Sequence, residues 1–222
     1  MLGPDEWTAV RLSLGVGLWS CALVVVPGIL LGWLFARARF PGKLLLEALV
    51  HLPLVVTPVV IGYGLLLVFG RHGPLGGLGL AFSYPGAVLA AAVVALPLVV
   101  RSVRTAIEMV DPGLEQAAAV LGAGPLRRFL GVTLPLALPG VIAGLVLGFA
   151  RSLGEFGATI TFAGSMPGTT TTLPIAIHTA TQVPGGDATA GRLTLISIAL
   201  SLLALAGSRS EERRVGKECA TG

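Results

Sequence analysis

The sequence predicts an all-α, polytopic membrane helix bundle with five transmembrane helices, and both its composition and its uncharged runs indicate this. Of the 222 residues, 54% are hydrophobic and 12% are charged, whereas soluble domains average about 25% charged residues. A helix that crosses a bilayer needs about 20 apolar residues. Runs without Asp, Glu, Lys or Arg cover residues 12–36, 48–70, 72–100, 129–150 and 193–208. Only the last run is short, so we expect one bundle and no large soluble domain.

Turn residues between the runs place the spans. We predict helices over residues 12–35, 45–69, 85–103 and 136–153, and a fifth that begins near residue 190. The second of them contains Pro53 and Pro58. Proline removes a backbone hydrogen bond, which lipid tolerates only where protein or a cavity satisfies the freed carbonyl. The second helix should therefore face protein or a pathway, and residues 104–135 should leave the membrane.

The distribution of basic residues predicts the orientation. Cytoplasmic loops of membrane proteins carry an excess of Lys and Arg. The 37–43 turn has three basic residues and segment 101–135 has four, whereas the 71–84 loop has one and the 155–191 loop has none. We therefore predict a membrane protein whose N-terminus lies outside and whose C-terminus and 111–135 segment lie in the cytoplasm.

Motifs for covalent chemistry are missing from the sequence. The phosphate-binding pattern G-x-x-x-x-G-K-[ST] does not occur, since Gly42-Lys43 is followed by Leu44, and G-x-S-x-G and H-E-x-x-H are absent as well. The two cysteines and three histidines show no metal-ligand spacing, and the basic residues lie at helix ends and form no stripe. We therefore predict no catalytic residue, no metal, no cofactor and no nucleic-acid partner, with energy supplied by a partner protein or a gradient.

The polar segment 111–135 has the pattern of two short helices joined at a glycine. Asp111 can cap the first helix with Pro112 in its first turn, Gly122 and Gly124 would end it, and Pro125 would open the second. One apolar face comprises Leu114, Ala118 and Leu121. Such a pair suits docking into a groove of a cytoplasmic partner. The alternative is a loop that lies on the lipid headgroups.

The same segment carries a resemblance to a known family. Glu115-Gln-Ala-Ala118, then Leu121-Gly122, then nine residues and Val132-Thr-Leu-Pro135 resemble the EAA loop of bacterial ABC-importer permeases. That resemblance implies a type I permease fold whose coupling helices insert into ATPase subunits. The sequence departs from the motif at Gln116, where the family usually has glutamate, with Glu115 just ahead of it. The resemblance implies that the coupling residues are Glu115, Gln116, Ala117, Ala118, Leu121, Gly122, Pro125 and Leu126.

A second resemblance concerns the substrate. Residues 150–168 and 172–177 resemble the molybdate permeases, and sulfate permeases have a similar segment. The resemblance implies a non-catalytic subunit of a molybdate or tungstate importer. Its implied partners are two cytoplasmic ATPase subunits, an external molybdate-binding protein, a second copy of the chain and the surrounding lipid. Alternatives are a sulfate or thiosulfate permease, a gradient-driven secondary carrier, and a membrane scaffold that transports nothing.

Polar residues near the outer end of the fourth span are candidates for the pathway. Arg151 and Glu155 are four apart, so on a continuing helix they would share a face. They could act on a passing anion, or they could neutralise each other as a structural pair. Thr159, Thr161 and Ser165 could offer hydroxyl donors to an oxyanion at the outer mouth. Against this, Thr and Gly clusters are typical of exposed loops.

The end of the chain differs in composition from the rest. Residues 1–208 form the predicted transmembrane domain, and residues 209–222 form a tail with seven charges within its first ten residues. We predict that this tail is non-native, because SEERRVGKEC resembles translated adapter sequence. The alternative is a basic cytoplasmic tail that binds anionic lipid.

Overall fold

The computed structural model describes the backbone of residues 3–220 and the side chains of residues 3–204. Every regular element in this part of the chain is a helix, so the all-α fold class is confirmed. The long helices are α1 (Pro4–Arg37), α4 (Tyr84–Glu108), α7 (Leu134–Leu153) and α10 (Asp187–Ala220). The shorter elements are α2 (Lys43–Val55), α3 (Pro58–Phe69), η1 (Gly76–Leu78), α5 (Pro112–Val120), α6 (Pro125–Arg128), the π-helical η2 (Phe129–Thr133), α8 (Gly157–Phe162) and α9 (Leu173–Thr181).

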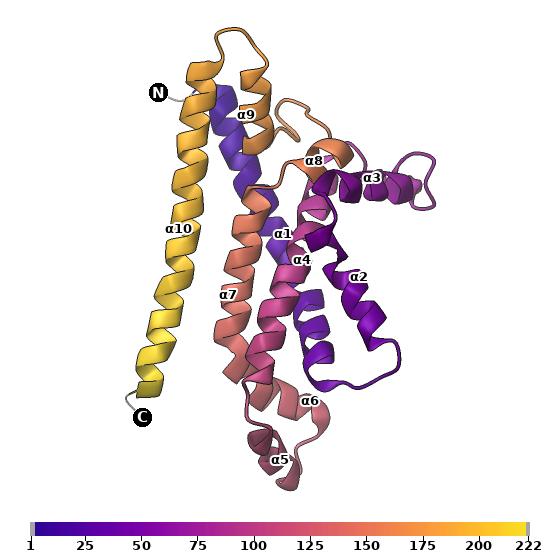
Figure 1. The fold of residues 1–222 in the computed structure, drawn as a ribbon, viewed down its shortest axis with the longest axis vertical. Coiled ribbons are helices and arrows are strands. Elements are labelled where there is room, and N and C mark those ends of the chain that lie inside the picture. Colours follow the sequence, from indigo (N-terminus) through magenta and orange to yellow (C-terminus); the bar gives the residue numbers. More distant parts are fainter. Residues whose placement is uncertain (1–2, 221–222) are drawn as a thin grey trace.

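The centre of the bundle is formed by α1, α4 and α7 (Figure 1). Small residues let their backbones approach closely, as is usual where lipid supplies no hydrophobic drive between helices. On α7, Cβ atoms built at Gly144 and Gly148 would lie 2.8 Å from Ser102 Cβ and 2.9 Å from Val99 Cγ2 of α4. This glycine ridge therefore packs inside the chain. Valines of α4 such as Val99 and Val103 are buried in the resulting core.

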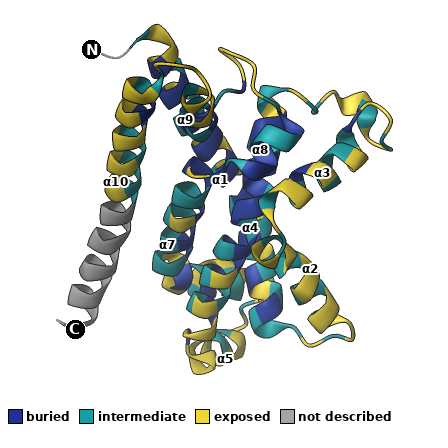
Figure 2. Ribbon diagram, turned by 45° about the horizontal axis from the view of Figure 1, so that its top comes forward, coloured by how far each residue is buried: buried dark blue, intermediate teal, exposed yellow. Residues whose placement is uncertain are grey.

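The prediction of one continuous second helix is wrong. The chain bends by 117° between α2 and α3. Pro58 is the first residue of α3, and Thr57 before it is extended, with φ −62° and ψ 141°, because proline disfavours the helical conformation of the residue that precedes it. Pro53 lies inside α2 and does not break it. Across the fully described α2 and α3, Gly62 is the single buried residue, so this chain leaves most of their apolar surface uncovered (Figure 2).

Other helix bounds extend beyond the sequence prediction. The first helix begins at Pro4 and ends at Arg37, and the third continues to Glu108. The fourth begins earlier than predicted, since α6, η2 and α7 run on as one continuous helical segment from Pro125 to Leu153. At the end of α4, the ion pair between Arg104 and Glu108, four residues apart, supports the last helical turn.

One end of the bundle, here called the α9 end, holds the N-terminus, α8, α9 and the start of α10 (Figure 1). Ser13 Oγ of α1 accepts a hydrogen bond from Leu173 N at 2.6 Å and so fixes the start of α9. Arg192 of α10 pairs with Glu6 of α1 at 2.6 Å. Phe162 of α8 packs edge-on against Phe69 of α3 and accepts a hydrogen bond from Phe82 N. The 71–84 and 155–191 loops therefore meet at one end.

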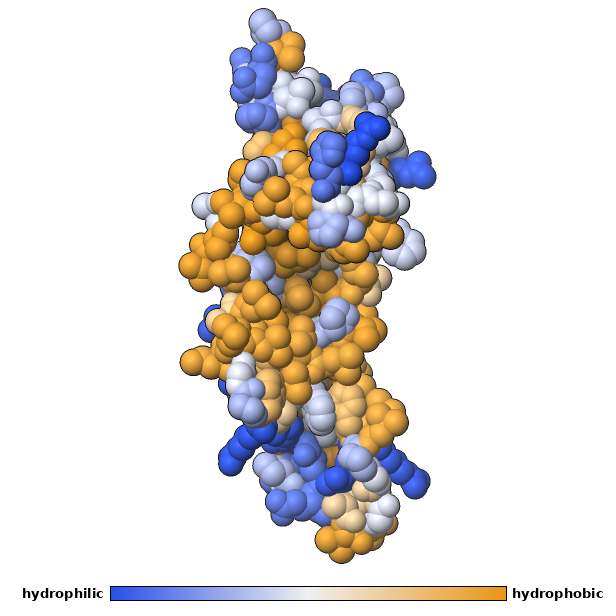
Figure 3. Space-filling model, turned by 90° about the vertical axis from the view of Figure 1, so that its right-hand side faces the viewer, coloured by the Kyte–Doolittle hydropathy of each residue, from blue (hydrophilic) through white to orange (hydrophobic). Residues whose placement is uncertain are grey.

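The opposite end, here called the α5 end, holds α5, α6 and the C-terminal end of α1. The contact between Arg37 and Glu115 places the 37–43 turn and segment 111–135 on the same side, as the distribution of basic residues predicts. Within the described residues, four helices are long and apolar enough to cross a membrane, and the bent α2–α3 pair makes five if it counts as one span. Figure 3 shows the corresponding apolar band, with hydrophilic residues gathered at both ends.

Candidate coupling surface and pathway

At the α5 end, two short helices are joined at a glycine, as predicted. Asp111 Oδ1 accepts a hydrogen bond from Gly113 N at 2.8 Å and caps α5, with Pro112 in its first turn. Gly122 has φ +84°, a left-handed conformation that residues with a Cβ adopt at a cost. Pro125 then opens α6. Local sequence thus dictates the whole helix–glycine–helix unit.

The outer surface of this unit is apolar and uncovered. Val120 and Leu121 are 88% and 87% exposed, and Leu126 is 69% exposed. Of the predicted coupling residues, Gln116, Ala117, Leu121, Gly122, Pro125 and Leu126 are exposed, whereas Glu115 and Ala118 are half-buried. Contiguous exposed apolar side chains outside the apolar band are typical of a protein–protein contact surface. We call the exposed set formed by Gln116, Val120, Leu121, Pro125 and Leu126 the coupling surface.

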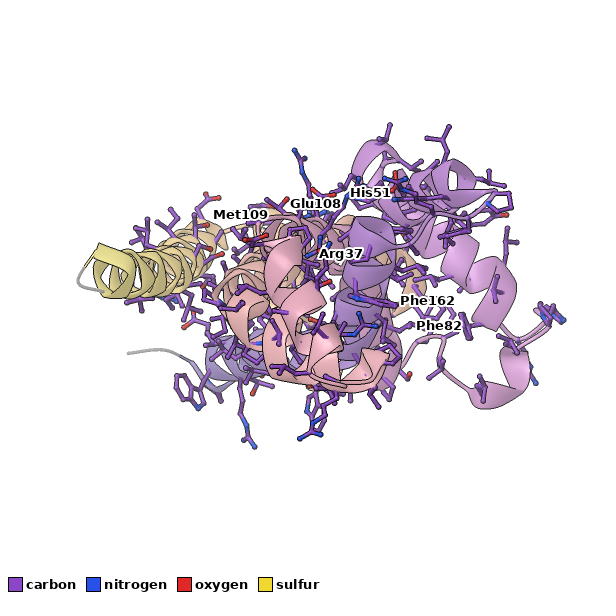
Figure 4. The ribbon with its side chains drawn as sticks, turned by 90° about the horizontal axis from the view of Figure 1, so that it is seen from below. Arg37, His51, Phe82, Glu108, Met109 and Phe162 are labelled. Atoms are coloured by element: carbon purple, nitrogen blue, oxygen red, sulfur yellow. The ribbon has the colours of Figure 1, made fainter. Side chains whose placement is uncertain are left out.

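Glu115 points away from the coupling surface and into the bundle. Its Oε1 lies 3.0 Å from Arg37 Nη2 of α1 and accepts a hydrogen bond from Thr133 Oγ1 of η2 at 2.8 Å. Arg37 Nη2 also donates to Val110 O at 3.0 Å, and Figure 4, which looks onto this end, labels Arg37 toward the middle of the bundle. Sequence reasoning missed Arg37 and Thr133. The available signal was a basic residue at the end of the first helix and a threonine at the start of the fourth.

At the α9 end, Arg151 and Glu155 do form a pair, but not on one continuous helix. Helix α7 ends at Leu153, so Glu155 lies in the turn before α8. Arg151 Nη1 and Glu155 Oε2 are 2.7 Å apart, a charge contact that lacks hydrogen-bond geometry. Glu155 Oε1 accepts from Ala158 N at 2.8 Å. Glu155 is buried by its neighbours, so this arrangement neutralises the carboxylate and fixes the start of α8.

The hydroxyl candidates for the outer mouth are distributed unevenly. Thr159 is buried and 1% exposed, and Thr161 donates its hydroxyl hydrogen to Gly157 O at 2.8 Å. Ser165 is exposed and lies 3.3 Å from the hydroxyl oxygen of Thr171. Of these three residues, Ser165 is exposed, Thr161 is half-buried and Thr159 is buried. The pathway role of Arg151, Glu155, Thr159, Thr161 and Ser165 stays a prediction.

Comparison with known proteins decides the family. The family described as "Binding-protein-dependent transport system inner membrane component" matches residues 28–217. The chain belongs to this family. It is accordingly a multi-pass inner-membrane protein of the binding-protein-dependent transporters, and its helix–glycine–helix unit lies within the matched region.

Several curated relatives are similar over nearly the whole chain. The molybdenum transport system permease protein ModB of Escherichia coli K12 is 53% identical over 212 residues, which cover 92% of this chain and 93% of the relative. ModB of Haemophilus influenzae Rd is 50% identical, with 98% of both chains covered. The sulfate transport system permease protein CysW of E. coli K12 is 39% identical, with 88% of this chain and 70% of the relative covered.

Solved structures share the fold at low sequence identity. The structure of a bacterial alginate ABC transporter in complex with an alginate-pentasaccharide-bound periplasmic protein matches with a TM-score of 0.76 at 18% identity, covering 96% of this chain and 80% of that chain. The structure of an amino acid ABC transporter matches with a TM-score of 0.66 at 19% identity, covering 95% and 94%. The ABC-importer permease fold class is therefore confirmed.

Proposed function

We propose that the chain is the membrane-spanning permease subunit of an ATP-driven molybdate importer. The observation that carries the proposal is the uncovered coupling surface on a helix–glycine–helix unit, within a chain 53% identical to a molybdenum transport permease over 92% of its length. The chain forms the translocation pathway and converts the movement of a partner ATPase into access from one side or the other. It hydrolyses no ATP itself.

The substrate assignment is molybdate, with tungstate as a second substrate of the same shape and charge. Identity is 53% to the molybdenum permease of E. coli K12 and 50% to that of H. influenzae Rd, against 39% to the sulfate permease of E. coli K12. Sulfate or thiosulfate is therefore the runner-up substrate. A gradient-driven secondary carrier is a weaker alternative, because such a carrier would need no coupling surface.

The orientation follows from the charges at the two ends. The α5 end holds Arg37, Arg39, Lys43, Arg127 and Arg128, and an excess of basic residues marks the cytoplasmic side. We place the α5 end in the cytoplasm, where two ATPase subunits dock on the two copies of the coupling surface. The α9 end then faces outward, where a molybdate-loaded binding protein docks.

A second copy of the chain completes the pathway. Helices α2 and α3 project from the side of the bundle (Figure 1), and their large apolar residues, such as Leu44, Leu49 and Val55, are exposed. Their hydropathy is that of a membrane span, so lipid alone could cover them. A homodimer covers them with protein and also explains how proline-broken helices come to lie beside a pathway.

The proposed function is tested by reconstitution. The chain is co-expressed with the ATPase subunit and placed in proteoliposomes, and ATP hydrolysis is measured after adding binding protein loaded with molybdate, tungstate or sulfate. We expect the ATPase subunit to co-purify and molybdate to give the largest stimulation. Stimulation by sulfate alone would overturn the substrate assignment. Uptake without any ATPase subunit would overturn the ATP-driven mechanism.

A matched pair of glycines tests the docking unit within the same experiment. Cβ atoms built at Gly122 and Gly124 both meet open space, but only Gly122 has a positive φ. Gly122→Ala should therefore tilt α5 relative to α6, at a strain of about 1–2 kcal/mol, and weaken ATPase binding by about tenfold. Gly124→Ala should bind as the unaltered chain does. Equal binding by the two variants would contradict the assigned docking unit.

A further inference from the structure

We propose that Arg37, Glu115 and Thr133 form a latch that positions α5 on the bundle and transmits its movement to α1 and α7. The inference rests on the proposed function and deepens it. It assigns Glu115, which the motif resemblance would place against the ATPase, to the inner side of the docking unit. The three residues are positioning residues, and none of them touches the transported anion.

The latch joins three parts of the chain that are far apart in sequence. Arg37 is the last residue of α1 and contacts Glu115, 78 residues away, while Thr133 is the last residue of η2 and directly precedes α7. The side chains of Arg37 and Glu115 are 21% and 22% exposed, and Thr133 is buried. Hydrogen bonds to an ionised group, such as those to the Glu115 carboxylate, are stronger than hydrogen bonds between neutral groups.

Little else holds α5 in place. None of its nine residues is buried, and its contacts are mainly with α6 and η2. Gly122, which leads to α6, has open space around it. Without the latch, a push on the coupling surface would therefore swing α5 about this glycine and would not be passed on to the spans.

On the side of the bundle, further hydrogen bonds hold the backbone around Arg37 in place. Lys43 Nζ donates to Phe35 O at 2.6 Å and to Ala38 O at 3.3 Å, which closes the C-terminal turn of α1. Arg37 Nη2 also donates to Val110 O in the middle of the α4–α5 connection. The π-helical turn of η2 ends at Thr133 and sets the rotation at which its hydroxyl meets Glu115. Such turns occur frequently at functional sites.

The experiment measures coupling in the assembled complex. For the complete complex in proteoliposomes, molybdate uptake and ATP hydrolysis are recorded together, with and without loaded binding protein. We expect Glu115→Gln and Arg37→Gln to retain the co-purified ATPase subunit and basal hydrolysis, but to lower uptake per ATP by about tenfold. Thr133→Val, which removes one hydroxyl and keeps the shape, should lower it by a smaller factor, about threefold.

Rescue variants separate positioning from general stability. Arg37 Nε has no partner among the described side chains, so Arg37→Lys can keep both contacts of Nη2 and should couple nearly normally. The exchange of Arg37→Glu together with Glu115→Arg should recover part of the coupling that each single change abolishes. Failure of both rescues would show that the two residues do not act as a pair and would overturn the latch.

A distance-matched ion pair at the same end serves as control. Arg104 and Glu47 tie α4 to α2 at 3.0 Å, the same distance as in the latch, and neither forms a hydrogen bond or ion pair with a described residue of α5. Glu47 also lies 3.9 Å from Lys43 Nζ, but the bonds from Lys43 to Phe35 O and Ala38 O do not depend on Glu47. Glu47→Gln should lower the melting temperature by as much as Glu115→Gln while leaving uptake per ATP unchanged. If both substitutions lower uptake per ATP equally, the effect is one of general stability and the latch is overturned.

Failure of the latch can be told apart from failure of the proposed function. If the unaltered chain fails to bind the ATPase, the proposed function fails. If it binds and Glu115→Gln couples normally, only the latch fails.

Discussion

The short helices α5 and α8 lie at opposite ends of the bundle, and each is held by a glutamate paired with an arginine, yet their surroundings differ. Four of the six residues of α8 are buried, and the Glu155 side chain is 1% exposed. No residue of α5 is buried, and the Glu115 side chain is 22% exposed. Figure 2 shows the same contrast between a buried α8 and an exposed α5.

This difference in burial indicates that α8 belongs to the rigid part of the molecule and α5 to a part that can move. A helix held by packing resists displacement, because many side chains would have to shift together. A helix held mainly by one charged contact can rotate about that contact when a partner protein pushes on it. We therefore assign α8 to the rigid α9 end and, under the proposed function, α5 to the element that an ATPase partner would move.

The largest expected effect is at the buried pair. Arg151→Met leaves Glu155 buried without its positive partner, and breaking a buried ion pair typically costs about 3–5 kcal/mol. Arg151 is itself one-third exposed, which favours the lower value. We expect a loss of about 3 kcal/mol, measured as thermal unfolding of the purified protein in detergent. Arg37→Met, at the more exposed pair, should cost clearly less, and equal losses would remove the contrast between the two ends.

A second effect concerns the packing of α8 against α3. A Cβ built at Gly62 would lie 2.7 Å from Ala158 O and 2.9 Å from Ala158 Cα, which are backbone atoms that cannot turn away. Gly62→Ala should therefore force α3 off α8 and cost about 2 kcal/mol of stability. Gly64→Ala on the same helix meets open space and should stabilise the helix slightly. Thermal unfolding of the pair measures the difference, and similar unfolding temperatures would contradict the described contact.

The smallest effect on stability is expected on α5. Val120 is 88% exposed, so Val120→Ala should change the free energy of unfolding by no more than about 0.5 kcal/mol. The same substitution removes apolar area from the coupling surface and should weaken ATPase binding severalfold in a titration of the purified subunits. A stability loss comparable to that of Gly62→Ala would show that α5 is packed and not exposed.

Features set by neighbouring residues could be predicted from the sequence. The cap at Asp111, the turn at Gly122 and the opening of α6 at Pro125 depend on local chemistry, and all three are found. The four long apolar helices and the shared side of the two basic loops follow from composition. Between Pro53 and Pro58, however, sequence did not identify the breaking residue. A Cβ built at Gly157 would lie 3.0 Å from Pro58 Cβ, so the bend lies beside a residue that is 99 positions away in the sequence.

Contacts between residues far apart in the sequence also limit how much of the site can be predicted. Glu115 meets Arg37 and Thr133 only in the folded bundle, and nothing in its local sequence says that it turns inward while Gln116 turns outward. Likewise, the end of α7 at Leu153 changes the geometry of Arg151 and Glu155. The assignment of residues 209–222 as a non-native tail concerns side chains outside the described part of the chain and stays a prediction.

The most direct test of the central claim is site-specific photo-crosslinking in the assembled membranes. A photoreactive amino acid is placed at Leu121, 87% exposed on the coupling surface, or at Leu195, 70% exposed on the side of α10. We predict that position 121 gives an adduct with the ATPase subunit and position 195 does not. An adduct from position 195 alone, or labelling of position 121 from the outer side of intact cells, would contradict a coupling role for α5.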